Sequence, residues 1–187
     1  LDDNEGTDTG TNYLDVSIGR FPLDDIDDIE KVVDKTEMYI TNSQQNMGDW
    51  RNVVCFVADD EDFNKHVSSS EKVSDSLANS NKNIDIDKIY LDAYPEVSTP
   101  GGERYPEVTE AINNRMEKGN LIMNYMGHGG EVGWAHERVL NVSDIINWKN
   151  LDKLSVFITA TCEFSRFDDP ERVSAGELVF NNPNGGA

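Results

Sequence analysis

Short apolar runs alternate with amphipathic segments along the chain, a pattern typical of strands joined by helices. Runs of strand length occupy residues 13–18, 52–58, 88–91, 121–126 and 154–160, and continuous apolar runs of this kind are common in buried parallel strands. Helical patterns cover 24–42, 68–79, 105–118, 144–148 and 173–180. Because strands separated by helices favour right-handed crossovers, we predict an α/β fold with a mostly parallel sheet and helices on both faces. Ser143 is the predicted N-cap of the helix at 144–148, and Gly119 is predicted to end the helix at 105–118.

The composition excludes several classes of protein. With 36 acidic and 16 basic side chains the formal charge is -20, so an acidic, solvated surface is expected and nucleic acid is not an expected partner. No run of 18 apolar residues is present, which argues against a membrane span. Two cysteines cannot form a dense disulfide scaffold. Residues 1–12 have a loop-like composition and lack the features of a signal peptide; residues 13–187 are expected to form one domain, incomplete at both ends.

Two residues with catalytic chemistry follow predicted strands. His128 lies in Gly127-His128-Gly129-Gly130 after the strand at 121–126, and Cys162 follows the strand at 154–160. If these strands are neighbours, imidazole and thiol project from the same edge of the sheet. An imidazole that accepts the thiol proton produces a thiolate that attacks a carbonyl carbon. The backbone amides of Gly129 and Cys162 would then stabilise the oxyanion. Taken singly, a cysteine at a strand end is more often a small buried side chain, and a lone histidine is more often satisfied locally.

The segments around these residues resemble a known family. MGHGGEVGW and FITATCEF are similar to the His and Cys motifs of the gingipain family of caspase-like cysteine endopeptidases. DVSIGRFP and WRNVVCFVADDED resemble further segments of that family in the same order. The resemblance implies a caspase-hemoglobinase-like catalytic domain over residues 13–187, with His128 as base and Cys162 as nucleophile. It assigns the acidic residue that orients the histidine to Asp60, one position from Asp59.

The same resemblance suggests substrate contacts and a cellular role. Trp134 corresponds to an aromatic residue that lines the specificity pocket in the family, although a core tryptophan beneath the His128 loop is the alternative. TATCEFSRFDDPERVSAGE resembles the sortase-like branch, the type IX secretion signal peptidase known as PorU. That branch implies cleavage, and transpeptidation, at C-terminal sorting signals of exported proteins. It also implies secretion-system subunits as partners and a place at the outer membrane or cell surface of a Gram-negative bacterium.

The remaining candidates are open to more than one interpretation. Cys55 lies in an apolar strand and is expected to be structural, and His136 is expected to be a surface histidine near the cleft. His66 and the acidic run 59–62 could bind a cation, for which Ca²⁺ is the natural choice, as could the acidic segment 2–8; no cofactor is required for the chemistry. The rival hypotheses are a non-catalytic scaffold that binds exported proteins or secretion partners and a flavodoxin-like nucleotide binder. The latter lacks a glycine-rich phosphate loop after the first strand.

Overall fold

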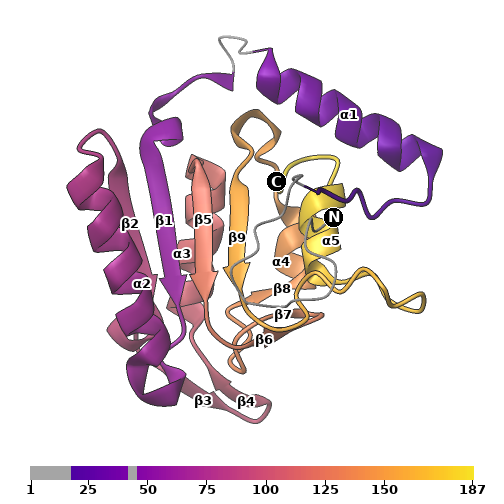
Figure 1. The fold of residues 1–187 in the computed structure, drawn as a ribbon. Helices are drawn as coiled ribbons and strands as arrows, with labels where there is room; N and C mark the ends of the chain where they lie inside the picture. The colour runs from indigo at the N-terminus through magenta and orange to yellow at the C-terminus, as the bar shows by residue number, and fades with distance from the viewer. Residues whose placement is uncertain (1–17, 42–45) are drawn as a thin grey trace, which may run out of the picture.

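The computed structural model describes residues 18–41 and 46–187. The loop predicted for 1–12, the acidic segment 2–8 and nearly all of the strand predicted for 13–18 lie outside these residues. The main sheet has four parallel strands in the order β2-β1-β5-β9 (Figure 1). Their bounds are Val53–Ala58 for β1, Asp85–Tyr90 for β2, Ile122–Met126 for β5 and Val156–Ala160 for β9. The predicted α/β fold with a parallel sheet is therefore confirmed.

Helices separate these strands, as the sequence pattern predicts. They are α1 (Ile26–Ile40), α2 (Glu61–Ser80), α3 (Pro106–Lys118), α4 (Val142–Asn147) and α5 (Ala175–Asn181), with 3₁₀ turns at Asp49–Asn52, Leu91–Ala93 and Leu151–Lys153. Gly119 ends α3 with a φ of 88°, a conformation that glycine adopts without strain. The start of α2 and the N-cap of α4 are among the boundaries that differ from the prediction. α2 begins at Glu61 rather than near residue 68, and the N-cap of α4 is Asn141 rather than Ser143.

Two small antiparallel sheets complete the fold. β3 (Val97–Thr99) pairs with β4 (Gly102–Arg104). β6 (Gly129–Gly130), β7 (Gly133–Trp134) and β8 (Leu140–Asn141) form a three-stranded sheet directly after β5. No helix in the described ranges combines the length and the apolar composition needed to cross a membrane.

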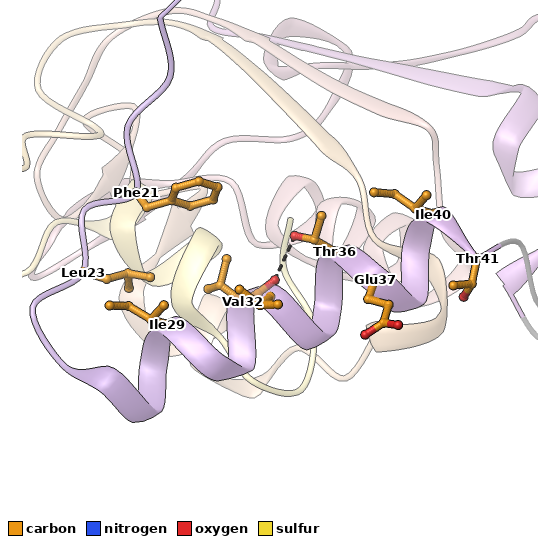
Figure 2. A pocket seen from close by; sticks show the side chains of 9 residues that line it. Phe21, Leu23, Ile29, Val32, Thr36, Glu37, Ile40 and Thr41 are labelled. Carbon is orange, nitrogen blue, oxygen red and sulfur yellow. Dashed lines mark hydrogen bonds between the residues drawn. The ribbon is translucent and has the colours of Figure 1, made fainter.

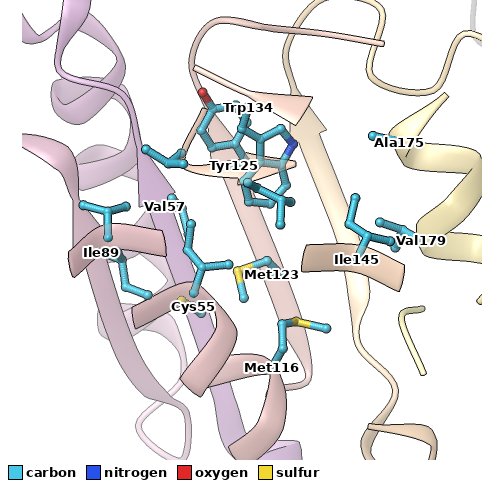
Figure 3. Close-up of a cluster of buried hydrophobic side chains, with 14 of the residues drawn as sticks. Cys55, Val57, Ile89, Met116, Met123, Tyr125, Trp134, Ile145, Ala175 and Val179 are labelled. Carbon is cyan, nitrogen blue, oxygen red and sulfur yellow. The ribbon is translucent and has the colours of Figure 1, made fainter. Parts of the chain in front are cut away.

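The core forms on both faces of the main sheet because side chains alternate along each strand. Cys55 and Val57 of β1, with Met123 and Tyr125 of β5, belong to the larger buried cluster, to which α3, α4 and α5 also contribute (Figure 3). The alternate residues of β1, namely Val54, Phe56 and Ala58, form a second cluster with side chains of α2. Helices thus cover the sheet from both sides.

The order of the strands determines where on the sheet a ligand site is expected. The chain passes from β1 to its neighbour β2, then crosses to the other side of β1 to form β5, and continues outward to β9. Right-handed crossovers in opposite directions put the connecting helices on opposite faces. The direction changes between β1 and β5, and ligands of such sheets bind outside the carboxyl ends of the strands at that point. Asp59, His128 and Cys162 all follow carboxyl ends of strands at this edge.

Candidate active site

His128 and Cys162 occupy matching positions on adjacent strands. Met126 of β5 pairs in register with Ala160 of β9, and each of the two residues comes two positions after its strand. Neighbouring strands lie about 4.8 Å apart. The two following loops stay close, because the amide of Gly127 donates to the Ala160 carbonyl at 3.3 Å. A Cβ at Gly129 would be only 2.5 Å from Thr161 Oγ1. The structure therefore brings the predicted base and nucleophile to one edge.

The thiol of Cys162 is exposed, whereas the other cysteine is buried. Glu163, the next residue, has a φ of 52°, so the chain turns sharply after Cys162. This left-handed conformation is unusual for glutamate and is typical of functional turns. Among the described residues, no hydrogen bond joins Cys162 Sγ to another group. Cys55 has no exposed surface, and burial raises the pKa of its thiol, as expected of a structural cysteine.

The backbone of His128 is fixed by three hydrogen bonds. Its amide donates to Asp59 Oδ2 at 2.9 Å. Its carbonyl accepts from the Ala135 amide at 2.8 Å and from Tyr125 Oη at 2.5 Å. Asp59 is fully buried, and its Oδ1 accepts from the Glu61 amide at 2.9 Å. One carboxylate thus ties the loop after β1 to the loop after β5. A Cβ at Gly127 would collide with Asp59, so glycine is required for this close approach.

The carboxylates nearest the His128 ring belong to Asp62 and Glu61. Nε2 lies 3.2 Å from Asp62 Oδ2 and 3.6 Å from Glu61 Oε2. Asp60, the predicted orienting residue, instead accepts a hydrogen bond from Tyr105 Oη at 2.8 Å. Burial, followed by this bond to Asp60, raises the pKa of the Tyr105 hydroxyl. The structure therefore pairs Asp60 with Tyr105 and places Asp62 at the imidazole.

The amide of Gly129 points away from the small sheet. The bond from Ala135 to the His128 carbonyl makes 128 and 135 a hydrogen-bonded pair of the β6–β7 ladder. Such pairs alternate with non-bonded pairs in antiparallel strands. The next pair, Gly129 with Trp134, is consequently a non-bonded pair whose amides face outward. Gly129 can therefore donate to a ligand at this edge.

Trp134 is a core residue in this structure. Its side chain has no exposed surface and stacks on Tyr125, with ring centroids 4.3 Å apart and an interplanar angle of 4°. Phe157 and Phe164 also contact the ring. A side chain without accessible surface cannot contact a substrate in this conformation. The structure places Trp134 in the core beneath the His128 loop, and its role in lining a specificity pocket stays a prediction.

Two further histidines gather around His128. The His66 ring meets the His128 ring edge-on with centroids 5.2 Å apart, and the His136 ring stacks on it at 5.2 Å. His136 Nδ1 lies 3.0 Å from Glu61 Oε2, and this bond raises the pKa of His136. The sequence predicts His136 near the cleft but not this contact. For His66, the only feature of the sequence that suggests a place near the site is its position after the acidic run.

Other groups engage the carboxylates of the acidic run 59–62, for which the sequence suggests Ca²⁺. Ca²⁺ takes six to eight oxygen ligands, but both oxygens of Asp59 accept backbone amides. Asp60 is engaged by Tyr105, and the remaining carboxylates, Glu61 and Asp62, face imidazoles. The Ca²⁺ site suggested by the sequence for this run therefore stays a prediction.

A large apolar cavity is separate from this site. It has a volume of about 600 Å³ and lies along α1, with an almost wholly apolar lining that includes Phe21, Val32 and Ile40 (Figure 2). Neither His128 nor Cys162 lines it. The catalytic candidates instead sit on an open edge of the sheet, and the chemistry of their side chains, rather than the size of a cavity, identifies the site.

Comparison with known proteins decides the family. The sequence profile described as "Peptidase family C25" matches residues 1–187. The chain belongs to peptidase family C25. This is the gingipain family of cysteine peptidases, so the family and enzyme class predicted from the motifs are confirmed. None of the curated protein sequences compared with this C25 chain matches it.

Solved structures show the same fold. Gingipain R, an Arg-specific cysteine proteinase, superimposes with a TM-score of 0.69 at 19% identity, covering 89% of this C25 chain and 37% of that chain. A complex of the pro- and mature domains of RgpB from Porphyromonas gingivalis gives 0.71 at 19% identity, covering 92% and 40%. A structure described as a protease gives 0.63 at 20% identity, covering 86% and 32%. The chain therefore spans well under half the length of these structures.

Proposed function

We propose that this chain carries the catalytic dyad of a cysteine endopeptidase, with Cys162 as nucleophile and His128 as base. The observation that supports this most directly is the register of β5 and β9, which puts both residues two positions beyond paired strand ends. The exposed thiol and the immobilised His128 backbone are what a dyad needs.

The proposed reaction has two halves. His128 accepts the proton of the Cys162 thiol, and the sulfur adds to the peptide carbonyl carbon. The amides of Gly129 and Cys162 stabilise the oxyanion. When the resulting tetrahedral intermediate collapses, the peptide C–N bond breaks and the imidazolium gives its proton to the leaving amine. A thioester then remains on Cys162. Water or a second amine then attacks the thioester and restores the thiol. No step uses a redox cofactor.

Asp62 takes the orienting role in this scheme. Its Oδ2 lies 3.2 Å from His128 Nε2, so Nδ1 is the ring nitrogen left to accept the thiol proton. A carboxylate at Nε2 fixes the tautomer and stabilises the imidazolium that forms. Proton transfer requires the His128 ring and the Cys162 thiol to approach each other, because the two are not hydrogen-bonded in this structure. Such bonds are often long in enzymes without substrate.

The sequence resemblance to the sortase-like branch supports a narrower proposal. The substrates would be exported proteins that carry a C-terminal sorting signal for type IX secretion. The thioester would be resolved partly by an amine, which gives transpeptidation. Secretion-system subunits would be partners, at the outer surface of a Gram-negative bacterium.

Thiol labelling in the full-length protein tests the dyad. A peptidyl electrophile should label Cys162 and not the buried Cys55. His128→Ala should slow labelling strongly, and Cys162→Ala should lower peptide cleavage at least about a thousandfold, as loss of a nucleophile does in other hydrolases. Cys55→Ala is the matched control and should leave labelling intact. Equal labelling of both cysteines, or none, would instead favour the non-catalytic scaffold.

A second assay separates the broad function from the narrow one. A peptide with a C-terminal sorting signal is incubated with the full-length protein and an amine nucleophile, and the products are identified by mass. Cleavage with transfer to the amine supports the sorting role. Hydrolysis of unrelated peptides alone would leave a cysteine peptidase but exclude the sorting role.

A further inference from the structure

The three histidines of the chain form one cluster with nearby carboxylates. The chain contains only three histidines, and the rings of His66 and His136 both lie with their centroids 5.2 Å from that of His128. The proton-transfer scheme uses His128 and a carboxylate but gives no role to His66. The proposed reaction therefore does not explain why the His66 imidazole lies beside the proposed base.

Three donor atoms of this cluster converge. Asp62 Oδ2 lies 3.2 Å from His128 Nε2 and 3.4 Å from His66 Nε2, and donors of these three residues lie within 4.8 Å of one another. Zn²⁺ binds imidazole nitrogen and carboxylate oxygen at about 2.0–2.2 Å in tetrahedral sites. The edges of such a tetrahedron are roughly 3.3–3.5 Å long, given those bond lengths. The two Asp62 distances therefore match edges of such a tetrahedron.

His66 Nε2 has no other partner. The atom is shielded from solvent and forms no hydrogen bond among the described residues, although a buried ring nitrogen without a partner is unfavourable. A metal ion between His66 and Asp62 would satisfy it. The backbone at Asp62 supports a functional origin of the arrangement, because φ is 55° there and stays positive through Phe63 and Asn64. Runs of strained residues of this kind cluster at functional sites.

The other carboxylates do not compete for this ion. Asp59 also lies near Glu61 and His128, but its two oxygens already accept the amides of Glu61 and His128. His136 bonds to Glu61 and does not belong to the converging set. The choice of ion follows from the ligands, because two imidazoles and one carboxylate suit Zn²⁺ far better than Ca²⁺.

We propose that Asp62, His66 and His128 form a Zn²⁺ site that inhibits the peptidase; the inhibitory part rests on the proposed function. Three protein ligands leave the fourth position to water. An imidazole that binds Zn²⁺ through Nε2 carries its proton on Nδ1 and cannot accept the proton of Cys162. The metal also holds the ring away from any approach to the thiol.

Direct metal binding tests the site without reference to activity. Zn²⁺ is titrated against a chromogenic chelator in the full-length protein with Cys162→Ala, so that the exposed thiol cannot act as a ligand. One ion per chain is expected. Asp62→Asn and His66→Gln should each weaken binding more than about tenfold, since loss of even an outer-shell partner costs 10–100-fold. Asparagine tolerates a positive φ, so the first variant keeps the loop. His136→Gln is the matched control.

Spectroscopy and kinetics complete the test. Zn²⁺ should shift the Nε2 resonances of His66 and His128 but leave those of His136 in place. In the protein with Cys162, Zn²⁺ should inhibit peptide cleavage, a chelator should restore it, and His66→Gln should reduce the inhibition. Equal affinity in all variants, or binding lost with Cys162→Ala, would overturn the site. Zinc binding in a protein that never cleaves peptides would keep the site and refute the proposed function.

Discussion

Glu61 connects His128 with His136 at the scale of single residues. Its Oε2 lies 3.6 Å from His128 Nε2 and 3.0 Å from His136 Nδ1. The bond from Glu61 raises the pKa of His136 above its ordinary 6.5. The stabilisation from this pair is therefore complete below pH 6.5 and is lost as the pH rises through the higher pKa of the folded protein. It is small, since the His136 side chain is 70% exposed.

Glu61→Gln should lower the pKa of His136 toward 6.5. The neutral amide removes the charge that favours the imidazolium. An NMR titration of the His136 ring measures the change directly. Glu71→Gln is the control, because Glu71 lies on the same helix but pairs with Lys88. An unchanged titration of His136 in Glu61→Gln would show that Glu61 does not hold this ring in solution.

Asp59 is expected to be more important for stability than its neighbour Asp60. Asp59→Asn replaces one of the two oxygens that accept the Glu61 and His128 amides and leaves a buried donor unsatisfied. The free energy of unfolding should fall by roughly 1.5–3 kcal/mol, the range for hydrogen bonds to a charged group. Urea denaturation measures it. Asp60→Asn, which can still accept from Tyr105, should cost clearly less; equal losses would contradict the bridging role.

The sequence predicts the proposed dyad but not its surroundings. His128 and Cys162 follow recognisable strands, so their strand-end positions can be read from the pattern alone. Asp62 and His66 approach His128 only because β1 and β5 are neighbours in the sheet, and the order of strands cannot be read from local hydrophobicity. The burial of Trp134 likewise depends on the turn from β6 to β7, which is set by tertiary packing.

At the scale of elements, the start of α4 shows which polar residue acts as a cap. Asn141 accepts the Ser143 amide at 2.9 Å, and Asp144 accepts the Asn141 amide at 3.0 Å in return. The sequence pattern predicts Ser143 as the cap, but pairing of Leu140 with Trp134 in β8 places Asn141 at the start of the helix instead. The strand ends at Asn141, so the helix begins at Val142.

Asn141→Ala should lower the free energy of unfolding by about 1 kcal/mol, the usual effect of removing an N-cap. Ser143→Ala should change it by less than about 0.5 kcal/mol, as is usual for surface substitutions. Thermal unfolding of the two variants compares them. A larger loss for Ser143→Ala would restore the assignment made from the sequence pattern.

The early start of α2 is a second case in which the pattern was insufficient. Residues 61–67 contain few apolar side chains, and Asp62, Phe63 and Asn64 have positive φ values of 55°, 57° and 58°. Helical periodicity cannot reveal a segment that is held by contacts with the next loop. The part that the pattern missed is the part that contacts His128.

At the scale of the whole molecule, the sheet is covered unevenly. β1 is buried on both faces, whereas Val156 and Ile158 of β9 are 50% and 49% exposed. These two side chains lie on the same face as the Val54 cluster under α2, but the described residues do not extend that cover to β9. The open face lies beside the strand that carries Cys162, and the solved relatives are more than twice as long as this chain.

The first helix is joined to the last segment through one buried lysine. Lys35 of α1 is 6% exposed, and its Nζ donates to the carbonyls of Phe180, Asn182 and Gly185 at 3.0, 3.0 and 2.9 Å. All three donor sites of the ammonium group are thus used. The bonded residues are separated in sequence by nearly the whole described chain. The bonds therefore link α1 to the segment that packs beside β9.

Lys35→Met should therefore lower the free energy of unfolding by roughly 2–3 kcal/mol. Methionine fills a similar volume but leaves three carbonyls without their donor, and each loss of a charged hydrogen bond is costly. Lys31→Met on the same helix is the control. Lys31 is exposed and pairs with Asp28 at 2.7 Å, so its loss should change stability by less than about 0.5 kcal/mol. Urea denaturation measures the free energy of unfolding of both variants. Equal losses in the two would mean that α1 is not anchored through Lys35.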